Sequence, residues 1–345
     1  MRWSGSGPIS PIGNRSSLDG VESEGRSIEC GVPQGSILGP LLFSLYVNDV
    51  THAVRVAKIV LYADDTAIYF KHASVEKIKL TLSEDFKRVS EWLGFNKLTL
   101  NAKKTKCMLF GTPNMLSTTA PLALSHGTDK IEQVASFKYL GVTLDSKLNF
   151  EDFIDEIARK VASRIAVLGR VRRYLPVRHR VMLFNTLVLP HFDYASIVWS
   201  NTHAKHLNRL IGLQRRASRV IMGLNSSDEA MDKLKWTPVD VRWSYQRAVT
   251  MFKVAHGLAP SYLSDKFKSP SESRRHGPVT RGQTTKNFGP SASVTNWGRR
   301  RLASHGVFIW NNLPGPLKLC AKLHEFKTQL KFLIRQKFNF YEFKS

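Results

Sequence analysis

Two adjacent acidic residues, Asp64 and Asp65, lie between two short runs of strand-forming residues. The runs, residues 59–63 and 66–70, are rich in β-branched and aromatic side chains and predict a β-hairpin with both acids at its tip. Neighbours on an extended strand face opposite sides, so both carboxylates reach one site only where the chain bends. Two carboxylates this close resist joint ionisation unless a cation lies between them. The pair therefore suits a hard divalent ion such as Mg²⁺, which takes one or two carboxylates together with substrate phosphates.

The acidic pair also has a plain structural alternative, and the other candidate ligands are weaker. Asp is a favoured turn residue, so an isolated Asp-Asp pair can be a solvated turn. A two-metal displacement needs carboxylates from at least two strands, so one pair supplies half of such a site. Asp49 is expected to be a helix-end residue rather than a substitute ligand. His203 and His206 could share a metal, but nothing nearby completes a ligand set and a surface role is favoured.

The elements that would position the pair can be read from turn residues and hydrophobic spacing. Residues 30–36 contain Pro and Gly and predict a turn, after which Ser36 would cap an apolar helix through Val50. Apolar residues recur at spacings of three and four over residues 75–93. This period predicts an amphipathic helix whose apolar face covers the sheet.

The pattern changes from strands to helices as the chain continues. Residues 97–110 alternate weakly and predict a strand with a basic turn, and residues 137–145 predict a second hairpin. Helical periods dominate over residues 153–223, with Pro176 and Pro190 as expected breakers. We therefore place a domain boundary near residue 150.

Positive charge is concentrated in the second half of the chain. The net charge is +24, and residues 1–150 carry 17 Lys and Arg against 14 Asp and Glu, whereas residues 151–345 carry 34 against 13. An excess this large predicts a polyanionic partner. Residues 159–180 hold eight Lys or Arg and no acid, which favours nucleic-acid contact over an ordinary solvated helix face of mixed sign. The residues expected to contact a nucleic-acid backbone are Arg159, Lys160, Arg164, Arg170, Arg172 and Arg173.

Cysteine usage and hydropathy bear on the compartment. Cys30, Cys107 and Cys320 are odd in number and widely spaced, which argues against a disulfide framework and a zinc finger. The most apolar run, residues 182–199, is interrupted by polar residues and Pro, and no signal-peptide pattern occurs at the N-terminus. We expect a nuclear or cytoplasmic protein without a membrane partner. Residues 1–20 show no period and are expected to be disordered.

Five short sequence motifs occur in a fixed order along the chain and include the features described above. The chain contains GVPQGSILGPLLF at 31–43, YVND at 46–49, YADD at 62–65, LTLN at 98–101 followed by Lys104-Thr105, and FKYLG at 137–141. The set closely resembles the palm motifs of reverse transcriptases. Its residues and their spacing look like those of the non-LTR (LINE-type) retrotransposon branch. Further similarity to that family's thumb and tail occurs in RYLP at 173–176, LVLPHFDYA at 187–195, Trp199, WNNLP at 310–314 and Phe326-Lys327.

The resemblance implies roles for residues and partners. It implies that Asp64 and Asp65 are catalytic and hold Mg²⁺, and that the chain acts on an RNA template, a DNA primer and deoxynucleoside triphosphates. The residues it places at the nucleotide and template are Pro33, Gln34, Gly35 and Lys104, and those it places at the primer end are Tyr139, Leu140 and Gly141. From the sequence alone, two interpretations of the basic turn at 103–106 are equally good: a contact with the triphosphate, or an ordinary solvated turn.

The N-terminal part departs from the family pattern. The family has another aspartate on a strand well before the Pro-Gln-Gly turn, whereas Asp19 is the only aspartate ahead of Pro33 and its setting is turn-like. The fingers are also missing. We therefore expect an N-terminally truncated RNA-directed DNA polymerase that is close to inactive alone, because a metal site without one ligand loses its geometry. The alternatives are a non-catalytic nucleic-acid-binding remnant of the element and an unexpressed reading frame.

The expected fold class is α+β. A partial palm, an antiparallel sheet with packed helices, would be followed by a mainly helical thumb and a basic C-terminal extension. The expected bounds are 1–20 for a disordered N-terminus, 21–150 for the palm, 151–262 for the thumb and 263–345 for the extension, with a linker within residues 262–290. Four tryptophans amid basic residues could stack on bases, although core packing is their more common role: Trp236, Trp243, Trp297 and Trp310.

Overall fold

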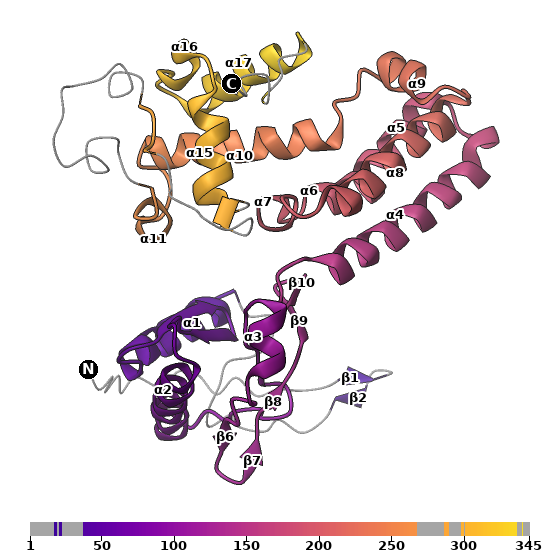
Figure 1. The fold of residues 1–345 in the computed structure, drawn as a ribbon. Coiled ribbons are helices and arrows are strands. Elements are labelled where there is room, and N and C mark those ends of the chain that lie inside the picture. The colour runs from indigo at the N-terminus through magenta and orange to yellow at the C-terminus, as the bar shows by residue number, and fades with distance from the viewer. Residues whose placement is uncertain are drawn as a thin grey trace, which may run out of the picture. The chain divides into compact units, whose positions relative to one another are not determined.

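The computed structural model describes residues 17–18, 21–22, 37–267, 286–289, 298–299, 301–336 and 340. Its contacts divide the chain into two compact units, each described here by itself (Figure 1). The N-terminal unit comprises residues 1–109 and 113–134, and the C-terminal unit comprises residues 110–112 and 135–345. This division falls before the second hairpin, which groups with the helices that follow it. The expected domain bounds stay a prediction, and the described elements, helices with small sheets, fit the α+β class.

Small two-stranded sheets and a few helices form the described part of the N-terminal unit. In chain order its elements are β1 (Ser17–Leu18), β2 (Val21–Glu22), α1 (Gly39–Val47), η1 (Asn48–Ala53), β3 (Lys58–Tyr62), β4 (Asp65–Tyr69), α2 (Val75–Phe95), β5 (Lys106–Cys107), α3 (Pro113–Thr118), β6 (Ser125–His126), β7 (Asp129–Lys130) and β8 (Glu132–Gln133). The pairs β1–β2, β3–β4 and β6–β7 are antiparallel, whereas β5 and β8 are parallel. The expected hairpin around the acidic pair is confirmed as β3–β4.

Helix α1 differs from its expected form at both ends. It ends at Val47, and the chain continues to Ala53 as the 3₁₀ helix η1 instead of an α-helix through Val50. Its N-cap position is Leu38, which makes no side-chain capping bond, and Ser36 lies outside the described residues. The helix is strongly apolar yet mostly exposed, as the 66% exposure of Leu45 illustrates.

Helix α2 confirms the predicted amphipathic helix and extends it to Phe95. The Ser74 hydroxyl accepts a hydrogen bond from the Lys77 backbone N–H at 3.2 Å, which satisfies one free donor at the start of the helix. The apolar positions of α2 pack against a small buried cluster in the same unit, made of Cys107, Leu109, Leu122, Leu124 and Ile131. The helix thereby supplies one wall of this core.

The strand expected within residues 97–110 is wrong for most of its length. Only β5, Lys106–Cys107, is a strand, and its partner is the parallel β8. The preceding residues form a turn because the Asn101 carbonyl accepts hydrogen bonds from the backbone N–H groups of Lys104 and Thr105, at 3.1 and 2.9 Å. The Asn101 side-chain Oδ1 also accepts from the Lys104 N–H at 3.1 Å. An Asn side chain that bonds to the backbone after it favours a turn over an extended ladder, which explains the difference.

Helices dominate the C-terminal unit, as expected. Its described elements are β9 (Ser136–Tyr139), β10 (Val142–Asp145), α4 (Glu151–Val171), η2 (Arg172–Tyr174), α5 (Val177–Leu183), the π-helical turn η3 (Phe184–Val188), α6 (Leu189–Asp193), α7 (Ser196–Trp199), α8 (Ala204–Met222), α9 (Ser227–Leu234), α10 (Val239–Ala255), α11 (Ser261–Ser264), α15 (Leu302–Asn311), α16 (Gly315–Lys318) and α17 (Leu323–Arg335). Strands β9 and β10 form the expected second hairpin. Helices α4 and α8 pack side by side (Figure 1).

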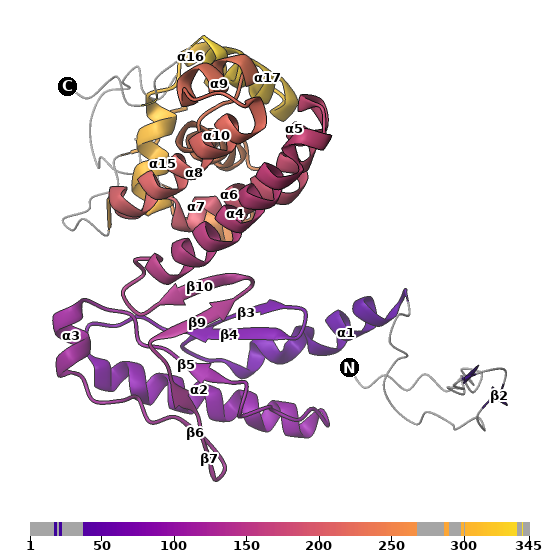
Figure 2. The same cartoon turned by 90° about the vertical axis from the view of Figure 1, so that its right-hand side faces the viewer.

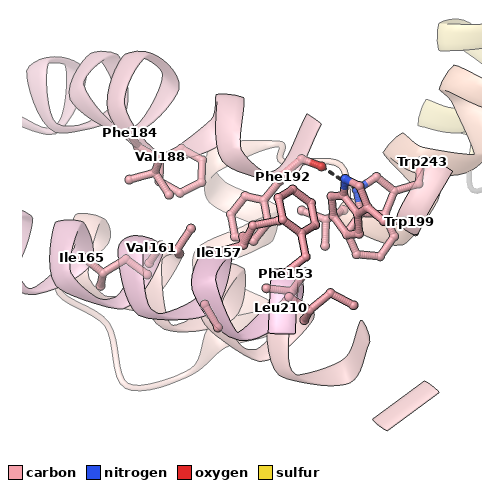
Figure 3. Packing of buried hydrophobic residues seen from close by; sticks show 14 of the residues in the cluster. Phe153, Ile157, Val161, Ile165, Phe184, Val188, Phe192, Trp199, Leu210 and Trp243 are labelled. Atoms are coloured by element: carbon pink, nitrogen blue, oxygen red, sulfur yellow. Dashed lines mark hydrogen bonds between the residues drawn. The ribbon is translucent and has the colours of Figure 1, made fainter. Parts of the chain in front are cut away.

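A long apolar stripe on α4 builds the first core of this unit (Figure 3). The stripe runs along one helical face at Phe153, Ile157, Val161 and Ile165, all of them buried. It packs against aromatic and aliphatic residues of the following helices, among which Figure 3 labels Phe184, Val188, Phe192, Trp199, Leu210 and Trp243. The Trp243 indole N–H donates to the Phe192 carbonyl at 2.8 Å, so its polar atom is satisfied inside the core.

A second core joins α10 to the last helices. Helices α15 and α17 pack against α10 (Figure 2), and Phe252, Trp310 and Phe326 meet there as fully buried rings. The core alternative is thus confirmed for Trp243 and Trp310. Trp236 is half-buried and stacks on Phe184, with ring centroids 4.1 Å apart.

Two further expectations concern proline and the chain outside these cores. Pro176 ends a helical segment as expected, but Pro190 does not: α5 continues through η3 into α6, and the π-helical turn accommodates the proline near the start of α6. Residues 1–16, most of the expected linker and Trp297 lie outside the described residues. None of the described helices combines the length and the apolar character needed to cross a membrane.

Candidate functional site

A tight two-residue turn presents the acidic pair. Tyr62 pairs with Asp65 across the hairpin, which leaves Ala63 and Asp64 as the connecting residues. Ala63 has φ = +51°, a left-handed value that short hairpin turns require and that costs a non-glycine residue about 1 kcal/mol or more. Asp64 and Asp65 are both exposed. The bend expected from the sequence is therefore present, and it presents the two carboxylates at the hairpin end.

A buried carboxylate, Asp85 of α2, holds the segment that leads into this hairpin. Asp85 is fully buried. Its Oδ2 accepts from the backbone N–H groups of Val56 and Ala57 at 3.0 and 2.7 Å, and its Oδ1 accepts from that of Arg55 at 3.1 Å. Arg88 donates to the same Oδ1 at 2.6 Å. The three backbone bonds fix the chain immediately before β3 begins at Lys58.

The pKa of Asp85 reflects opposing effects. Burial by itself raises the pKa of the carboxyl group, but the three backbone N–H bonds and Arg88 outweigh burial, and the net pKa lies below its usual value. Sequence reasoning missed this residue, although a signal exists. Ile78, Leu82, Asp85 and Val89 follow one another at helical spacings of three and four, so an acid occupies the apolar face of α2.

The other candidate ligands do not join the acidic pair. Within residues 37–267 and the shorter described segments, no group of three or more His, Cys, Asp or Glu is placed to hold a metal ion. Asp49 is an exposed residue in the first turn of η1, as its helix-end assignment predicts. His206 lies 3.8 Å from Glu151, and its ring centroid is 6.4 Å from that of His203. Pro33, Gln34 and Gly35 lie outside the described residues.

Lys104 and Lys106 of the basic turn differ in whether an acidic residue of the described chain pairs with them. Lys104 is exposed in the turn held by Asn101. Lys106 instead donates to Glu132 at 2.5 Å, across the β5–β8 pair. Of these two lysines, only Lys104 therefore keeps its charge available to a ligand.

The second hairpin ends in a turn that a tyrosine supports. Leu140 and Gly141 both have positive φ, +44° and +77°, as a type I′ turn requires. The Tyr194 hydroxyl donates to the Leu140 carbonyl at 2.6 Å. A Cβ on Gly141 would lie 3.3 Å from the Tyr194 ring, so the close approach also needs glycine. Tyr139 is the last residue of β9 and directly precedes this turn.

Glu156 of α4 ties the same hairpin to the helix that follows it. Its carboxylate accepts from Lys138 of β9 at 3.0 Å and from Lys160 at 2.6 Å. The Lys160 and Lys138 hydrogen bonds, with a smaller contribution from the two positive charges, lower the pKa of Glu156 to about 2. Lys160 is thus engaged within the protein, although it was expected to contact nucleic acid.

The eight basic residues at 159–180 form what we call the basic stripe, and those other than Lys160 differ in their surroundings. Arg164 is half-buried against His191. Burial and the charges of Arg164 and Lys160 lower the pKa of His191, which keeps that ring neutral beside the arginine. Five others are exposed: Arg159, Arg170, Arg172, Arg173 and Arg178. Most of the positive charge of the stripe therefore lies at the surface.

Comparisons with known proteins agree with this set of features. Residues 9–144 match the family described as reverse transcriptase (RNA-dependent DNA polymerase). The chain is 30% identical over 217 residues to the RNA-directed DNA polymerase from mobile element jockey of Drosophila melanogaster, covering 60% of this chain and 23% of that protein. It is 24% identical over 204 residues to the probable RNA-directed DNA polymerase from transposon X-element of the same species, covering 57% of this chain and 22% of that protein.

A third relative is shorter. The chain is 29% identical over 223 residues to the Pol polyprotein from type-1 retrotransposable element R1 of Nasonia vitripennis, covering 61% of this chain and 66% of that protein. The chain thus spans about a quarter of the jockey and X-element proteins. No solved structure matches it. Residues 9–144 thus carry a reverse transcriptase domain, and the relatives matched include RNA-directed DNA polymerases from mobile elements.

Proposed function

We propose that this chain supplies the metal-holding hairpin and the duplex-binding helices of an RNA-directed DNA polymerase. The observation that carries the proposal is the tight β3–β4 turn that presents Asp64 and Asp65 within the segment matching the reverse transcriptase family. In this proposal residues 21–150 are a partial palm, residues 151–262 are the thumb and residues 263–345 are a basic C-terminal extension.

The reaction assigned to the site is nucleotide addition. The primer 3′-hydroxyl attacks the α-phosphate of a deoxynucleoside triphosphate, a new phosphodiester bond forms, and pyrophosphate leaves. Mg²⁺, when bound, stabilises the attacking and leaving oxygens. The exposed carboxylates at 64 and 65 would hold it, because oxygen ligands suit this ion. Lys104 would neutralise charge on the triphosphate, and Pro33, Gln34 and Gly35 would lie against the nucleotide and template.

The second hairpin and α4 would bind the duplex. In the proposal, Tyr139, Leu140 and Gly141 contact the primer end, and the supported turn at Tyr194 gives them a fixed shape. The exposed guanidinium groups of Arg159, Arg170 and Arg173 contact phosphates. Lys160, Arg164 and Arg172 belong to the same proposed set of phosphate contacts, and Lys160 and Arg164 also bond to Glu156 and His191.

Primer extension on poly(rA)/oligo(dT) with Mg²⁺ tests the catalytic assignment. Asp64→Asn should lower extension at least 100-fold, since the neutral amide is a poor Mg²⁺ ligand. Asp129→Asn is the matched control, because Asp129 is an exposed aspartate at the tip of the β6–β7 hairpin of the same unit. Extension that survives Asp64→Asn would refute the proposal.

A second function is favoured by one observation. The part of the chain that the structure describes contains no group of three or more potential metal ligands around the acidic pair. A chain that binds a duplex in a salt-dependent way but extends no primer would be a nucleic-acid-binding remnant. The same assay separates the two, because the remnant extends no primer with either Asp64 or Asn at this position.

A further inference from the structure

An open hollow in the C-terminal unit lies where α4 and α8 end. It has a volume of about 400 Å³ and is lined by Arg172, Arg216, Arg219, Val220, Leu224 and Asn225. Only Arg172 belongs to the basic stripe read from the sequence. Arg216 and Arg219 lie on another helix, more than forty residues away along the chain, and the packing of α4 against α8 brings them to the same place.

A glycine shapes this hollow, which we name the arginine pocket. Gly223 ends α8 with φ = +75°, a left-handed conformation that glycine adopts without strain. The Arg172 guanidinium packs closely over it, since a Cβ at position 223 would lie 3.3 Å from Arg172 Cζ. The glycine thus both turns the chain toward Asn225 and leaves room for the first arginine.

The charges in the pocket have no counterpart in the described part of the chain. Arg172, Arg216 and Arg219 form no ion pair there, whereas Arg209 of the same α8 pairs with Asp155 and Lys160 of α4 pairs with Glu156. A fourth arginine adds to the field. Burial and the charge of Arg172 lower the pKa of Arg180. Like charges gathered in this way are stabilised by an external anion.

Helix capping does not account for these arginines. The Arg219 carbonyl already accepts from the backbone N–H groups of Gly223 and Leu224, at 2.8 and 3.3 Å. Arg180 donates to the Ile221 carbonyl. Two carbonyls at the end of α8 are therefore bonded without the side chains of Arg216 and Arg219, which are exposed and line the pocket.

We propose that the arginine pocket binds adjacent phosphodiester groups of a nucleic-acid duplex. Planar guanidinium groups make paired hydrogen bonds to phosphate oxygens, and three of them around one hollow fit two neighbouring phosphates. Asn225 adds a polar side chain at the rim that can donate to the same oxygens. The inference rests on the proposed duplex-binding function and adds a discrete anchoring site at the far end of α4.

The test is binding of a fluorescently labelled RNA–DNA hybrid as a function of NaCl. Arg216→Gln with Arg219→Gln should weaken binding roughly tenfold or more and reduce the slope of log K against log salt by about 1–2, since each lost phosphate contact lowers it by roughly 0.9. Lys205→Gln with Lys253→Gln is the control, because it removes the same charge from exposed sites of the same unit. The control should change binding less than threefold.

Two further variants and a small anion separate the alternatives. Arg216→Lys with Arg219→Lys keeps the charge but not the paired geometry, so its affinity should fall between those of the wild type and the glutamine variant. Equal far-ultraviolet circular dichroism and melting temperature would show that all variants fold. If inorganic phosphate raises the melting temperature of the wild type alone and hybrid binding is unchanged in the glutamine variant, the pocket binds free phosphate and the proposal is wrong.

The outcomes also separate this inference from the proposed function. If the Arg216→Gln, Arg219→Gln variant binds the hybrid as well as the Lys205→Gln, Lys253→Gln control does, the pocket proposal is wrong but the polymerase assignment stands. Loss of hybrid binding in the glutamine variant, together with primer extension that survives Asp64→Asn, supports the pocket and refutes the polymerase assignment. A wild-type chain that binds no hybrid overturns both.

Discussion

Replacing Asp85 by asparagine should loosen the segment that leads into the acidic hairpin. The carboxylate accepts three backbone N–H groups and one guanidinium N–H with two oxygens. An amide has one acceptor oxygen, and its NH₂ group would face donors on the other side. If the oxygen stays on Val56 and Ala57, the Arg55 N–H and Arg88 lose their acceptor.

The size of the expected stability loss depends on which of the released N–H donors can bond to water instead. Hydrogen bonds to a charged group are each worth about 1.5–3 kcal/mol, and an unpaired buried donor costs about 1–3 kcal/mol. Ala57 is buried, whereas Arg55 and Val56 are exposed and can bond to water once released. We therefore expect a loss of about 2–4 kcal/mol in the free energy of unfolding of the N-terminal unit. With a urea m-value of about 2 kcal/mol/M, in the middle of the usual range, the midpoint should fall by roughly 1–2 M.

Urea unfolding and hydrogen exchange together measure this effect. Exchange should accelerate in the amides of residues 55–62 and stay unchanged in the C-terminal unit. Glu91→Gln is the control, because Glu91 is an exposed acid on the same helix, and its only ion pair among the residues that the structure describes is a 3.9 Å contact with Lys87. Such a surface pair is worth about 0–1 kcal/mol. Equal midpoints and equal exchange in the two variants would refute the anchoring role of Asp85.

For three other substitutions, the structure predicts the direction of the change in stability or in its pH dependence. Gly141→Ala should cost about 1–2 kcal/mol in urea unfolding, because φ is +77° and the new methyl would meet the Tyr194 ring; an unchanged midpoint would contradict this. Glu156 has a lowered pKa, so its stabilisation is complete above its usual pKa of 4.5 and is lost as pH falls toward about 2; Glu156→Gln should flatten that acid limb in pH-dependent melting. Burial lowers the pKa of Lys318 from 10.5 to about 8, so the unfolded chain binds more protons between these values and stability should rise with pH there; Lys318→Met should abolish the rise.

Hairpins and helices were predictable wherever the pattern was local and strong. The acidic hairpin, the β9–β10 hairpin and α2 all follow from residues within about twenty positions of one another, and each is present. The expected strand at 97–110 failed because Asn101 makes local backbone bonds that favour a turn. Pro190 failed as a breaker because a π-helical turn accommodates it within one helical run.

By itself, the sequence determined the acidic turn, the reverse transcriptase motifs and the excess of positive charge, because these are properties of neighbouring residues and of composition. Tertiary structure alone decided which charged groups act together. Asp85 meets the backbone of residues 55–57 about thirty positions earlier, and Arg172 meets Arg216 and Arg219 only because α4 packs on α8. The physical reason is that periodicity shows which face of a helix is buried, whereas the partner of that face is set by packing between distant segments.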